Sequence, residues 1–385
     1  MAHPPRCLRP AAARTLSRTF VRGTTYTRPV FFANSTLRHH SSFASPSNPS
    51  SSSSSSSSPS ASVSADELSH FSALASSWWD PMGPSRVLHL MNPLRHDFIA
   101  ECLAEAHPRY YVPPQATDTA AGDASAGAET SAKQQEGLRY LDVGCGGGIF
   151  AESLARTIPL SSSSAGTATA TDAASILAID PSTTLIRIAR DHARTDPTLH
   201  EHLRSGRFRY ENTTIEALSS PSPSTSTPEA ENTNPASGCG SGERKEFDVI
   251  TLFEVLEHVE SPLSFLTHTL RLLRPGGWLI GSTIARTFPS WLVNQVIAEA
   301  PWPIGVVPRG THEWSKFVNP DEARGWVEEA LMRAKDGAVR KAGSEALDGM
   351  RWKCAGVMYF PGIGWRIVRG TESWGNYFWA VRKGV

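Results

Sequence analysis

The 385-residue sequence predicts an α/β fold built on a mostly parallel sheet of seven strands, with an antiparallel C-terminal edge and helices on both faces. Short apolar runs of strand length alternate with helix-like segments from about residue 138 to residue 283. Strands that alternate with helices form parallel sheets, because the crossover helices cover the faces of the sheet. Two later apolar runs, Gly356–Tyr359 and Tyr377–Arg382, follow a helix predicted over Asp321–Ala334 and supply the antiparallel edge.

The first 65 residues differ in composition from the rest of the chain. They contain seven Arg and no Lys, Asp or Glu, whereas the remainder holds 30 Lys and Arg against 37 Asp and Glu, a net charge near −7. An Arg- and Ser-rich start without acids is typical of a mitochondrial transit peptide, although an ordinary disordered tail would also fit. We therefore expect a transit peptide and Ser-rich linker over residues 1–65 and one folded domain over residues 66–385. In that domain we expect a helical cap over residues 66–105. We also expect three disordered insertions, over residues 115–137, 161–175 and 219–244.

Cysteine spacing, hydropathy and charge exclude several classes of protein. The five Cys show no C-x-x-C spacing, which argues against a zinc module and against a disulfide framework. No apolar run approaches the roughly 18 residues of a transmembrane helix. The acidic body argues against a nucleic-acid partner, because phosphate binding needs a basic face.

A glycine-rich turn, Leu141–Gly148, follows the first predicted strand. Glycines let the backbone approach a ligand closely, and the start of the next helix offers unpaired N–H groups. A dinucleotide fingerprint read from Gly144 fails at Ile149, whereas the tighter G-x-G-x-G spacing resembles motif I of class I S-adenosylmethionine-dependent methyltransferases. A second strand, Ile176–Asp180, ends in a carboxylate that can accept hydrogen bonds from both ribose hydroxyls of such a cofactor. The simpler alternative is that this Asp only caps the next helix.

A helical segment with a break at Asp80–Pro84 precedes the glycine turn. It contains the pair Trp78 and Trp79, for which packing in the core or in a lid is the expectation. It also contains Arg95, whose guanidinium could bind the carboxylate of the cofactor in bidentate fashion. By position alone, a surface ion pair is the simpler interpretation of Arg95.

The remaining parallel strands and the helix between them are predicted over Phe208–Glu211, Phe247–Phe253, Pro262–Leu273 and Trp278–Thr283. Ligands of parallel sheets bind at the carboxyl ends of the strands. Gly144, Asp180 and Phe253 all stand at such ends, so we expect them on one edge of the sheet.

An acid-rich segment follows the fourth strand directly. In a helical turn, Glu254, Glu257 and His258 would stand at i, i+3 and i+4 and point the same way. Two carboxylates and an imidazole suit a divalent cation such as Mg²⁺ or Mn²⁺. From spacing alone, residues that stabilise a turn are the simpler interpretation, and a metal-free general base at His258 is another.

Taken together, these motifs resemble the family of ubiquinone-biosynthesis O-methyltransferases, mitochondrial and bacterial. The motifs that carry the resemblance are Phe71–Asp80, Leu88–Arg95, Leu141–Ile149, Glu254–Val259, Pro275–Gly277, Ser290–Leu292 and Gly310–Trp314. The resemblance runs from Phe71 to Lys383 and implies a Rossmann-like class I methyltransferase fold. The implied ligands are S-adenosylmethionine at Arg95, Gly144, Asp180 and Phe253, and Mg²⁺ at Glu254, Glu257 and His258.

The resemblance also implies a substrate and a location. The substrates would be the polyprenylated catechols 3,4-dihydroxy-5-polyprenylbenzoate and demethylubiquinol, methylated by a peripheral protein on the matrix side of the mitochondrial inner membrane within a multi-subunit complex. An amphipathic pattern over Ser290–Ala300 fits packing on the protein itself or, as the resemblance suggests, contact with lipid. His312 is either a contact to the ring or a structural histidine, and no catalytic base is assigned. A non-catalytic scaffold and an NAD-dependent oxidoreductase are the alternative functions.

Overall fold

The structure is a computed structural model, and not every part of the chain is described by it. The described residues are 63–64, 67, 69, 71–72, 75–83, 85–105, 137–160, 169–220, 246–292, 299, 313–335, 347–360 and 362–385. All of them belong to one compact unit, Ser57–Val385. The expected transit peptide and most of the three expected insertions lie outside the described residues.

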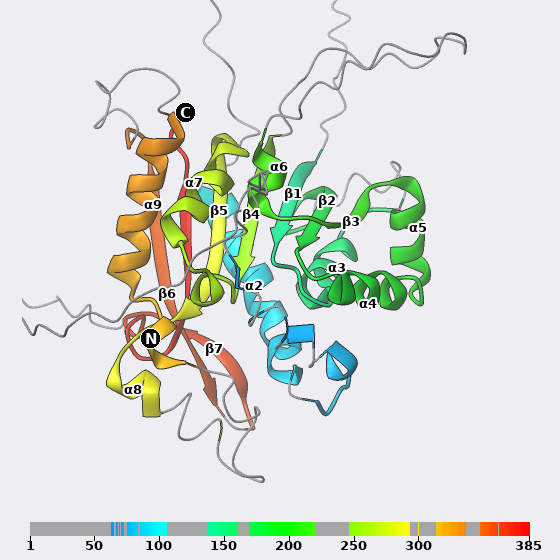
Figure 1. The fold of residues 1–385 in the computed structure, drawn as a ribbon, viewed down its shortest axis with the longest axis horizontal. Coiled ribbons are helices and arrows are strands. Elements are labelled where there is room, and N and C mark those ends of the chain that lie inside the picture. The colour runs from blue at the N-terminus through cyan, green and yellow to red at the C-terminus, as the bar shows by residue number, and fades with distance from the viewer. Residues whose placement is uncertain are drawn as a thin grey trace, which may run out of the picture. The chain divides into compact units, whose positions relative to one another are not determined.

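Eight strands form one sheet in the described part of the chain, in the order β3-β2-β1-β4-β5-β8-β6-β7 (Figure 1). Their bounds are β1 Leu138–Val143, β2 Ala173–Asp180, β3 Phe208–Asn212, β4 Phe247–Phe253, β5 Leu273–Ile284, β6 Arg351–Phe360, β7 Gly364–Val368 and β8 Asn376–Arg382. Strands β1 to β5 pair in parallel, and β8 pairs antiparallel with β5 and β6. The predicted mostly parallel sheet with an antiparallel C-terminal edge is therefore confirmed. The sheet has one strand more than predicted, because the short, half-exposed β7 forms a hairpin with β6.

Helices cover both faces of the sheet. The α-helices are α2 Arg86–Glu105, α3 Ile149–Ala155, α4 Thr183–Ala193, α5 Pro197–Ser205, α6 Ile215–Ser219, α7 Pro262–Arg271, α8 Phe288–Trp291 and α9 Pro320–Lys335, and the 3₁₀ turns are η1 Ala75–Ser77, η4 Leu256–His258 and η6 Trp314–Lys316. Successive strand residues point to opposite faces, so Tyr140 and Leu141 on β1 belong to different apolar cores. The core around Tyr140 includes residues of α2, α3, α4 and α5, and the core around Leu141 includes residues of α6, α7 and α9.

The second strand begins earlier than the sequence predicts. The Ser- and Ala-rich tract 161–175 was expected to be an insertion, but its last three residues, Ala173–Ser175, belong to β2. These small residues have little intrinsic preference for strands. They extend because they pair in parallel with the buried strand β1, where Leu138 faces Ala173 and Arg139 faces Ser175. Tertiary pairing therefore overrides local propensity at this boundary.

The strand order reverses between β1 and β4, which are adjacent in the sheet although β2 and β3 separate them in the chain. In open parallel sheets, ligands bind beside such a switch point, at the carboxyl ends of the strands. Neighbouring strands β2, β1 and β4 end at Asp180, Val143 and Phe253. The fold therefore brings the predicted site residues of all three strands to one edge.

Candidate functional site

The glycine turn between β1 and α3 has a backbone that glycine alone adopts easily. The φ angle is 71° at Gly144, 54° at Gly146 and 90° at Gly148, all in the left-handed region. A Cβ atom at Gly148 would lie 2.3 Å from the hydroxyl oxygen of Tyr210. The Gly144 N–H donates to the carbonyl oxygen of Ile179 on β2 over 2.9 Å. The turn is thus fixed against the ends of β2 and β3.

Asp180, the last residue of β2, binds the glycine turn directly. Its Oδ2 accepts a hydrogen bond from the Gly146 N–H at 2.9 Å, and its Oδ1 accepts one from the Ser182 N–H at 2.8 Å. Burial raises the pKa of this carboxyl, and the two N–H groups oppose that effect. The N-cap of α4 is Ser182, whose Oγ accepts from the Leu185 N–H, so Asp180 is not the simple helix cap of the alternative interpretation.

Arg95 on α2 is buried at the same site. Its side chain is only 3% exposed, so the surface ion pair that position alone suggested is wrong. The guanidinium donates to Asn92 Oδ1 over 3.0 Å, and its central carbon lies 4.8 Å from the ring centroid of Phe253. Burial lowers the pKa of Arg95 to about 10, against the nearby charges of Glu254 and Asp142, which raise it.

Asp142 lies within the Leu141–Gly148 run and is a site residue that the sequence-based prediction did not single out. Its Oδ1 accepts a hydrogen bond from Thr251 Oγ1 at 2.6 Å, whereas its buried Oδ2 has no hydrogen-bond partner among the described residues. Burial raises the pKa of this carboxyl to about 7, although the Thr251 hydroxyl and the Arg95 charge oppose the shift. An acid between the apolar residues Leu141 and Val143 was the signal that could have identified it.

The tryptophan pair packs on the glycine turn. The Trp79 indole N–H donates to the Gly147 carbonyl oxygen over 2.9 Å, and its ring stacks on His192 with centroids 3.5 Å apart. A Cβ atom at Gly146 would lie 2.7 Å from the Trp78 ring. The helical segment before α2 therefore covers the turn, as expected of a lid or core contact.

The acidic segment after β4 does not form the predicted helical face. Glu254 has a φ angle of 57°, and its N–H donates to the Ser282 carbonyl oxygen on β5 over 3.2 Å. Only Leu256–His258 forms a turn, and that turn is a 3₁₀ helix. The i, i+3 and i+4 argument was wrong here, because a left-handed residue at Glu254 redirects the chain before the turn begins.

Hydroxyl groups of β5 nevertheless hold both glutamates. Ser282 Oγ donates to Glu254 Oε1 over 2.6 Å, and Thr283 Oγ1 donates to Glu257 Oε2 over 2.7 Å. Burial, followed by the charge of Glu254, raises the pKa of Glu257 to about 7. Two carboxylates are thus kept near each other, at a site that favours the protonated form of Glu257.

One cavity of about 620 Å³ joins the glycine turn to this acidic segment. All seven predicted site residues line it, namely Arg95, Gly144, Asp180, Phe253, Glu254, Glu257 and His258. Within the described part of the chain, however, no three or more His, Cys, Asp or Glu side chains are arranged to hold a metal ion. The predicted metal ligands therefore share a cavity without forming a ligand cluster.

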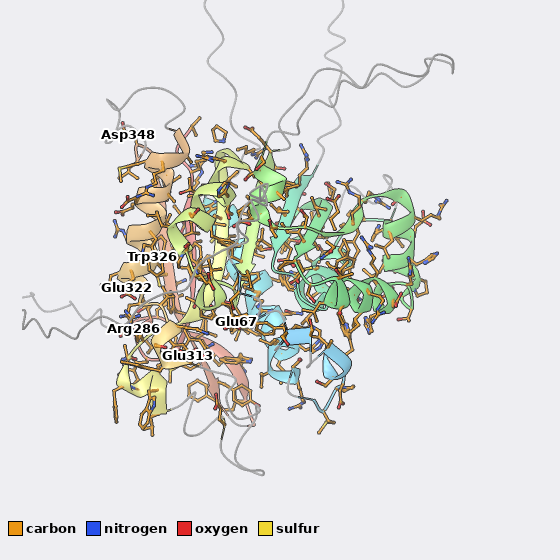
Figure 2. All side chains as sticks on the ribbon, in the orientation of Figure 1. Glu67, Arg286, Glu313, Glu322, Trp326 and Asp348 are labelled. Atoms are coloured by element: carbon orange, nitrogen blue, oxygen red, sulfur yellow. The ribbon has the colours of Figure 1, made fainter. Side chains whose placement is uncertain are left out.

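Two further charged residues of the cavity wall escaped the sequence analysis. Glu67, labelled in Figure 2, has its Oε2 3.1 Å from His258 Nδ1 and its Oε1 2.8 Å from Lys316 Nζ. These contacts join residues 191 and 249 positions apart, so no local pattern could reveal them. His312, which the sequence analysis considered, lies outside the described residues.

The chain is similar in sequence to a family of known proteins. Residues 121–330 match the model of a methyltransferase domain. The chain is 32% identical to the mitochondrial ubiquinone biosynthesis O-methyltransferase of Candida albicans, over 84% of this chain and 86% of that protein. It is 34% identical to the ubiquinone biosynthesis O-methyltransferase of Cereibacter sphaeroides, over 68% of this chain and 80% of that protein. A solved methyltransferase domain of bacterial CtHen1 is 11% identical over 77% of this chain and all of that one, with a TM-score of 0.40.

Proposed function

This chain belongs to the family of ubiquinone biosynthesis O-methyltransferases, and from that premise we propose that it methylates a phenolic hydroxyl of polyprenylated catechols. The methyl donor is S-adenosylmethionine, and the enzyme is an O-methyltransferase of ubiquinone biosynthesis. The proposed substrates are 3,4-dihydroxy-5-polyprenylbenzoate and demethylubiquinol. The observation that carries the proposal is that all seven predicted residues line one shared cavity at the ends of β1, β2 and β4. The alternatives, a scaffold and an NAD-dependent oxidoreductase, have no comparable support.

The wall of the cavity fits the polar end of S-adenosylmethionine. Three buried polar atoms there lack a hydrogen-bond partner among the described residues: Nε of Arg95, Oδ2 of Asp142 and Nε1 of Trp78. Buried polar groups are normally hydrogen-bonded, so these two donors and one acceptor suit a ligand with a carboxylate and an ammonium group. When bound, S-adenosylmethionine supplies a methyl group on a positively charged sulfur.

We assign the cofactor contacts by chemistry. Arg95 receives the carboxylate of the cofactor, because a buried guanidinium binds carboxylates strongly. The backbone at Gly144 allows close approach, and Asp180 accepts hydrogen bonds from the ribose hydroxyls with lone pairs that Gly146 and Ser182 do not use. Phe253, whose ring lies against the guanidinium of Arg95, lines the same cavity.

We also propose that Glu254, Glu257 and His258 hold Mg²⁺. Support comes from the donor types and from charge: burial and the charge of Glu254 raise the pKa of Glu257, and a cation would stabilise both carboxylates in their ionised form. A serine hydroxyl donates to one oxygen of Glu254, and a threonine hydroxyl donates to one oxygen of Glu257. Mg²⁺, when bound, would supply a Lewis acid that lowers the pKa of a phenolic hydroxyl.

The protein also keeps water from the reacting atoms. A phenol has a pKa near 10, so few molecules are ionised at neutral pH. Aromatic side chains of the cavity wall, including Phe71, Phe150 and Phe317, exclude water and leave a phenolate poorly hydrated. Holding the ring in line with the methyl group converts the transfer into an effectively unimolecular step.

An apolar surface beside the cavity fits contact with lipid. Phe288 is 69% exposed, and its ring lies 5.6 Å from that of the exposed Trp291 on α8. Thr287 connects this helix to two further regions: its carbonyl oxygen accepts from the Trp314 indole, and its hydroxyl donates to the carbonyl of Ser373, which precedes the exposed Trp374. Aromatic residues are favoured at the interface between membrane and water. This patch supports the proposal that α8 begins a lipid-contacting element, most of which lies outside the described residues.

The mitochondrial names of the relatives support a mitochondrial location for this chain. Our finer proposal is peripheral attachment to the matrix side of the inner membrane, as one subunit of a ubiquinone-biosynthesis complex. Among the helices that the structure describes, none has the length and apolarity needed to cross a membrane. Flotation with liposomes tests the attachment: F288S/W291S should lose binding, and unchanged flotation would remove the proposal.

Transfer of a radiolabelled methyl group to a short-chain catechol tests the function, with and without a chelator. We expect turnover that the chelator and E257Q abolish, and calorimetry should detect S-adenosylmethionine but not NAD. Absence of methyl transfer despite cofactor binding would favour the scaffold. Full activity of E257Q in the presence of chelator would remove Mg²⁺ from the proposal and leave the methyl transfer in place.

A further inference from the structure

The first described residues of the chain contact the site at both ends. This N-terminal strap comprises Val63, Ser64, Glu67, Ser69, Phe71 and Ser72. Val63 pairs antiparallel with Val259, which follows η4, and Ser72 Oγ lies 3.3 Å from Ser182 Oγ, just beyond β2. Between these contacts in the chain, Glu67 and Phe71 line the cavity. The strap therefore joins the end of β4 to the end of β2.

The carboxylate of Glu67 contacts two side chains. His258 Nδ1 lies 3.1 Å from one carboxylate oxygen, and Lys316 Nζ lies 2.8 Å from the other. Lys316 is itself 2.8 Å from Glu313 Oε2, so one ammonium group contacts both carboxylates. The Glu67 side chain is only 15% exposed. The hydrogen bond with His258, opposed by burial and aided by Lys316, lowers the pKa of Glu67.

The imidazole of His258 is fixed on a second side as well. The Phe71 ring meets it edge-on, with centroids 4.8 Å apart and an interplanar angle of 88°. In a neutral imidazole one nitrogen donates and the other accepts, and the partner of the first decides which is which. A carboxylate can only accept, so in the neutral ring the hydrogen resides on Nδ1 and the lone pair on Nε2.

We propose that Glu67 is a positioning residue, which accepts the Nδ1–H of His258 and thereby presents the Nε2 lone pair to the cavity. This inference deepens the proposed function and rests on it, because an Nε2 lone pair is what coordination of a cation by His258 requires. Carboxylates commonly hold metal-binding histidines in this way. The strap then completes the site with a residue that is remote in the sequence from the other site residues.

The tautomer of His258 is a direct readout of this role. In full-length protein labelled with ¹⁵N-histidine, H258Q identifies the resonances of His258, which are recorded at alkaline pH so that the ring is neutral. Glu67→Leu keeps the approximate size of the side chain and removes the acceptor. Glu67→Gln keeps an acceptor oxygen. Glu105→Leu is the matched control, since Glu105 also pairs with a lysine, Lys353 at 2.7 Å, but does not line the cavity.

We expect wild type, E67Q and E105L to show the Nδ1–H tautomer and E67L to lose it. We expect E67L to lower kcat by about 10- to 100-fold, as loss of such partners commonly does, with the KM for S-adenosylmethionine unchanged. E67Q should retain most of the turnover. Glu67→Ala removes the same acceptor and replaces E67L if that variant does not fold.

Two results would overturn the inference: a wild-type tautomer of His258 in E67L, or turnover of E67L equal to that of E105L. Failure of the proposed function has a different signature. A wild-type protein that transfers no methyl group to a catechol would refute the activity, while the tautomer of His258 would still decide the role of Glu67.

Discussion

Replacing Asp180 tests whether this residue organises the glycine turn as well as the cofactor site. Asp180→Ala leaves two buried N–H groups, of Gly146 and Ser182, without the acceptors that now lie 2.9 and 2.8 Å away. A buried donor without a partner costs about 1–3 kcal/mol, so the free energy of unfolding should fall by about 2–6 kcal/mol. Asp180→Asn has only one amide oxygen to offer, so it should lose about 1–3 kcal/mol.

Urea unfolding of the cofactor-free protein, followed by tryptophan fluorescence, measures this loss. Asp196→Ala is the control, because its Oδ1 accepts from the Thr198 N–H at 2.9 Å at a helix end that water reaches. Loss of such a cap costs about 1 kcal/mol. In calorimetry, D180N should weaken S-adenosylmethionine binding by roughly 10- to 100-fold, as expected for a hydrogen bond to a charged group. A D180A variant no less stable than D196A would refute the reasoning.

Three further predictions concern the glycine turn and residues close to it. Gly148→Ala should lower the free energy of unfolding by more than Gly206→Ala does. Both positions have positive φ, but only a Cβ at residue 148 would meet another atom within 4 Å. In urea unfolding, Gly206→Ala should cost about 1–2 kcal/mol. Burial raises the pKa of Asp142 from 3.8 to about 7, so between these pH values the folded state retains a proton that the unfolded state loses. The contribution of this group to stability therefore falls as the pH rises from about 4 to about 7. In a series of urea midpoints measured over this pH range, D142N should show a smaller decrease than the wild type. Trp79→Phe removes the 2.9 Å hydrogen bond to the glycine turn and should weaken S-adenosylmethionine binding in calorimetry without abolishing folding, whereas unchanged affinity would separate the tryptophan pair from the site.

Much of the sheet is predictable from the sequence because its strands are buried on both faces. The fourth strand, Phe247–Phe253, is apolar at most positions and is found at its predicted bounds. Such runs arise where helices cover both sides of a parallel sheet. The limits of prediction appear where burial is partial or residues are small. The half-exposed β7 was missed for the first reason, and the start of β2 at Ala173 for the second.

Some residues of the site are likewise predictable from the sequence, and others are not. Gly144, Asp180 and Phe253 stand at strand ends, so an alternating pattern places them on one edge before any coordinates are known. Arg95 required the resemblance to a family, because nothing in its helix distinguishes a buried guanidinium from an exposed one. Asp142 had a local signal in its charge, but that signal was not followed.

Glu67 and Lys316 mark the limit of any argument from local pattern. Their contact spans 249 residues, and it exists only because the sheet brings the segment after β5 and the N-terminal strap to the same strand ends. The left-handed backbone at Glu254 has a related cause. Its N–H is used by the Ser282 carbonyl of the neighbouring strand, so β5 rather than the local sequence decides how the chain leaves β4. Orientation of His258 therefore depends on three distant segments at once, and for that reason a residue outside every recognisable motif can control a residue inside one.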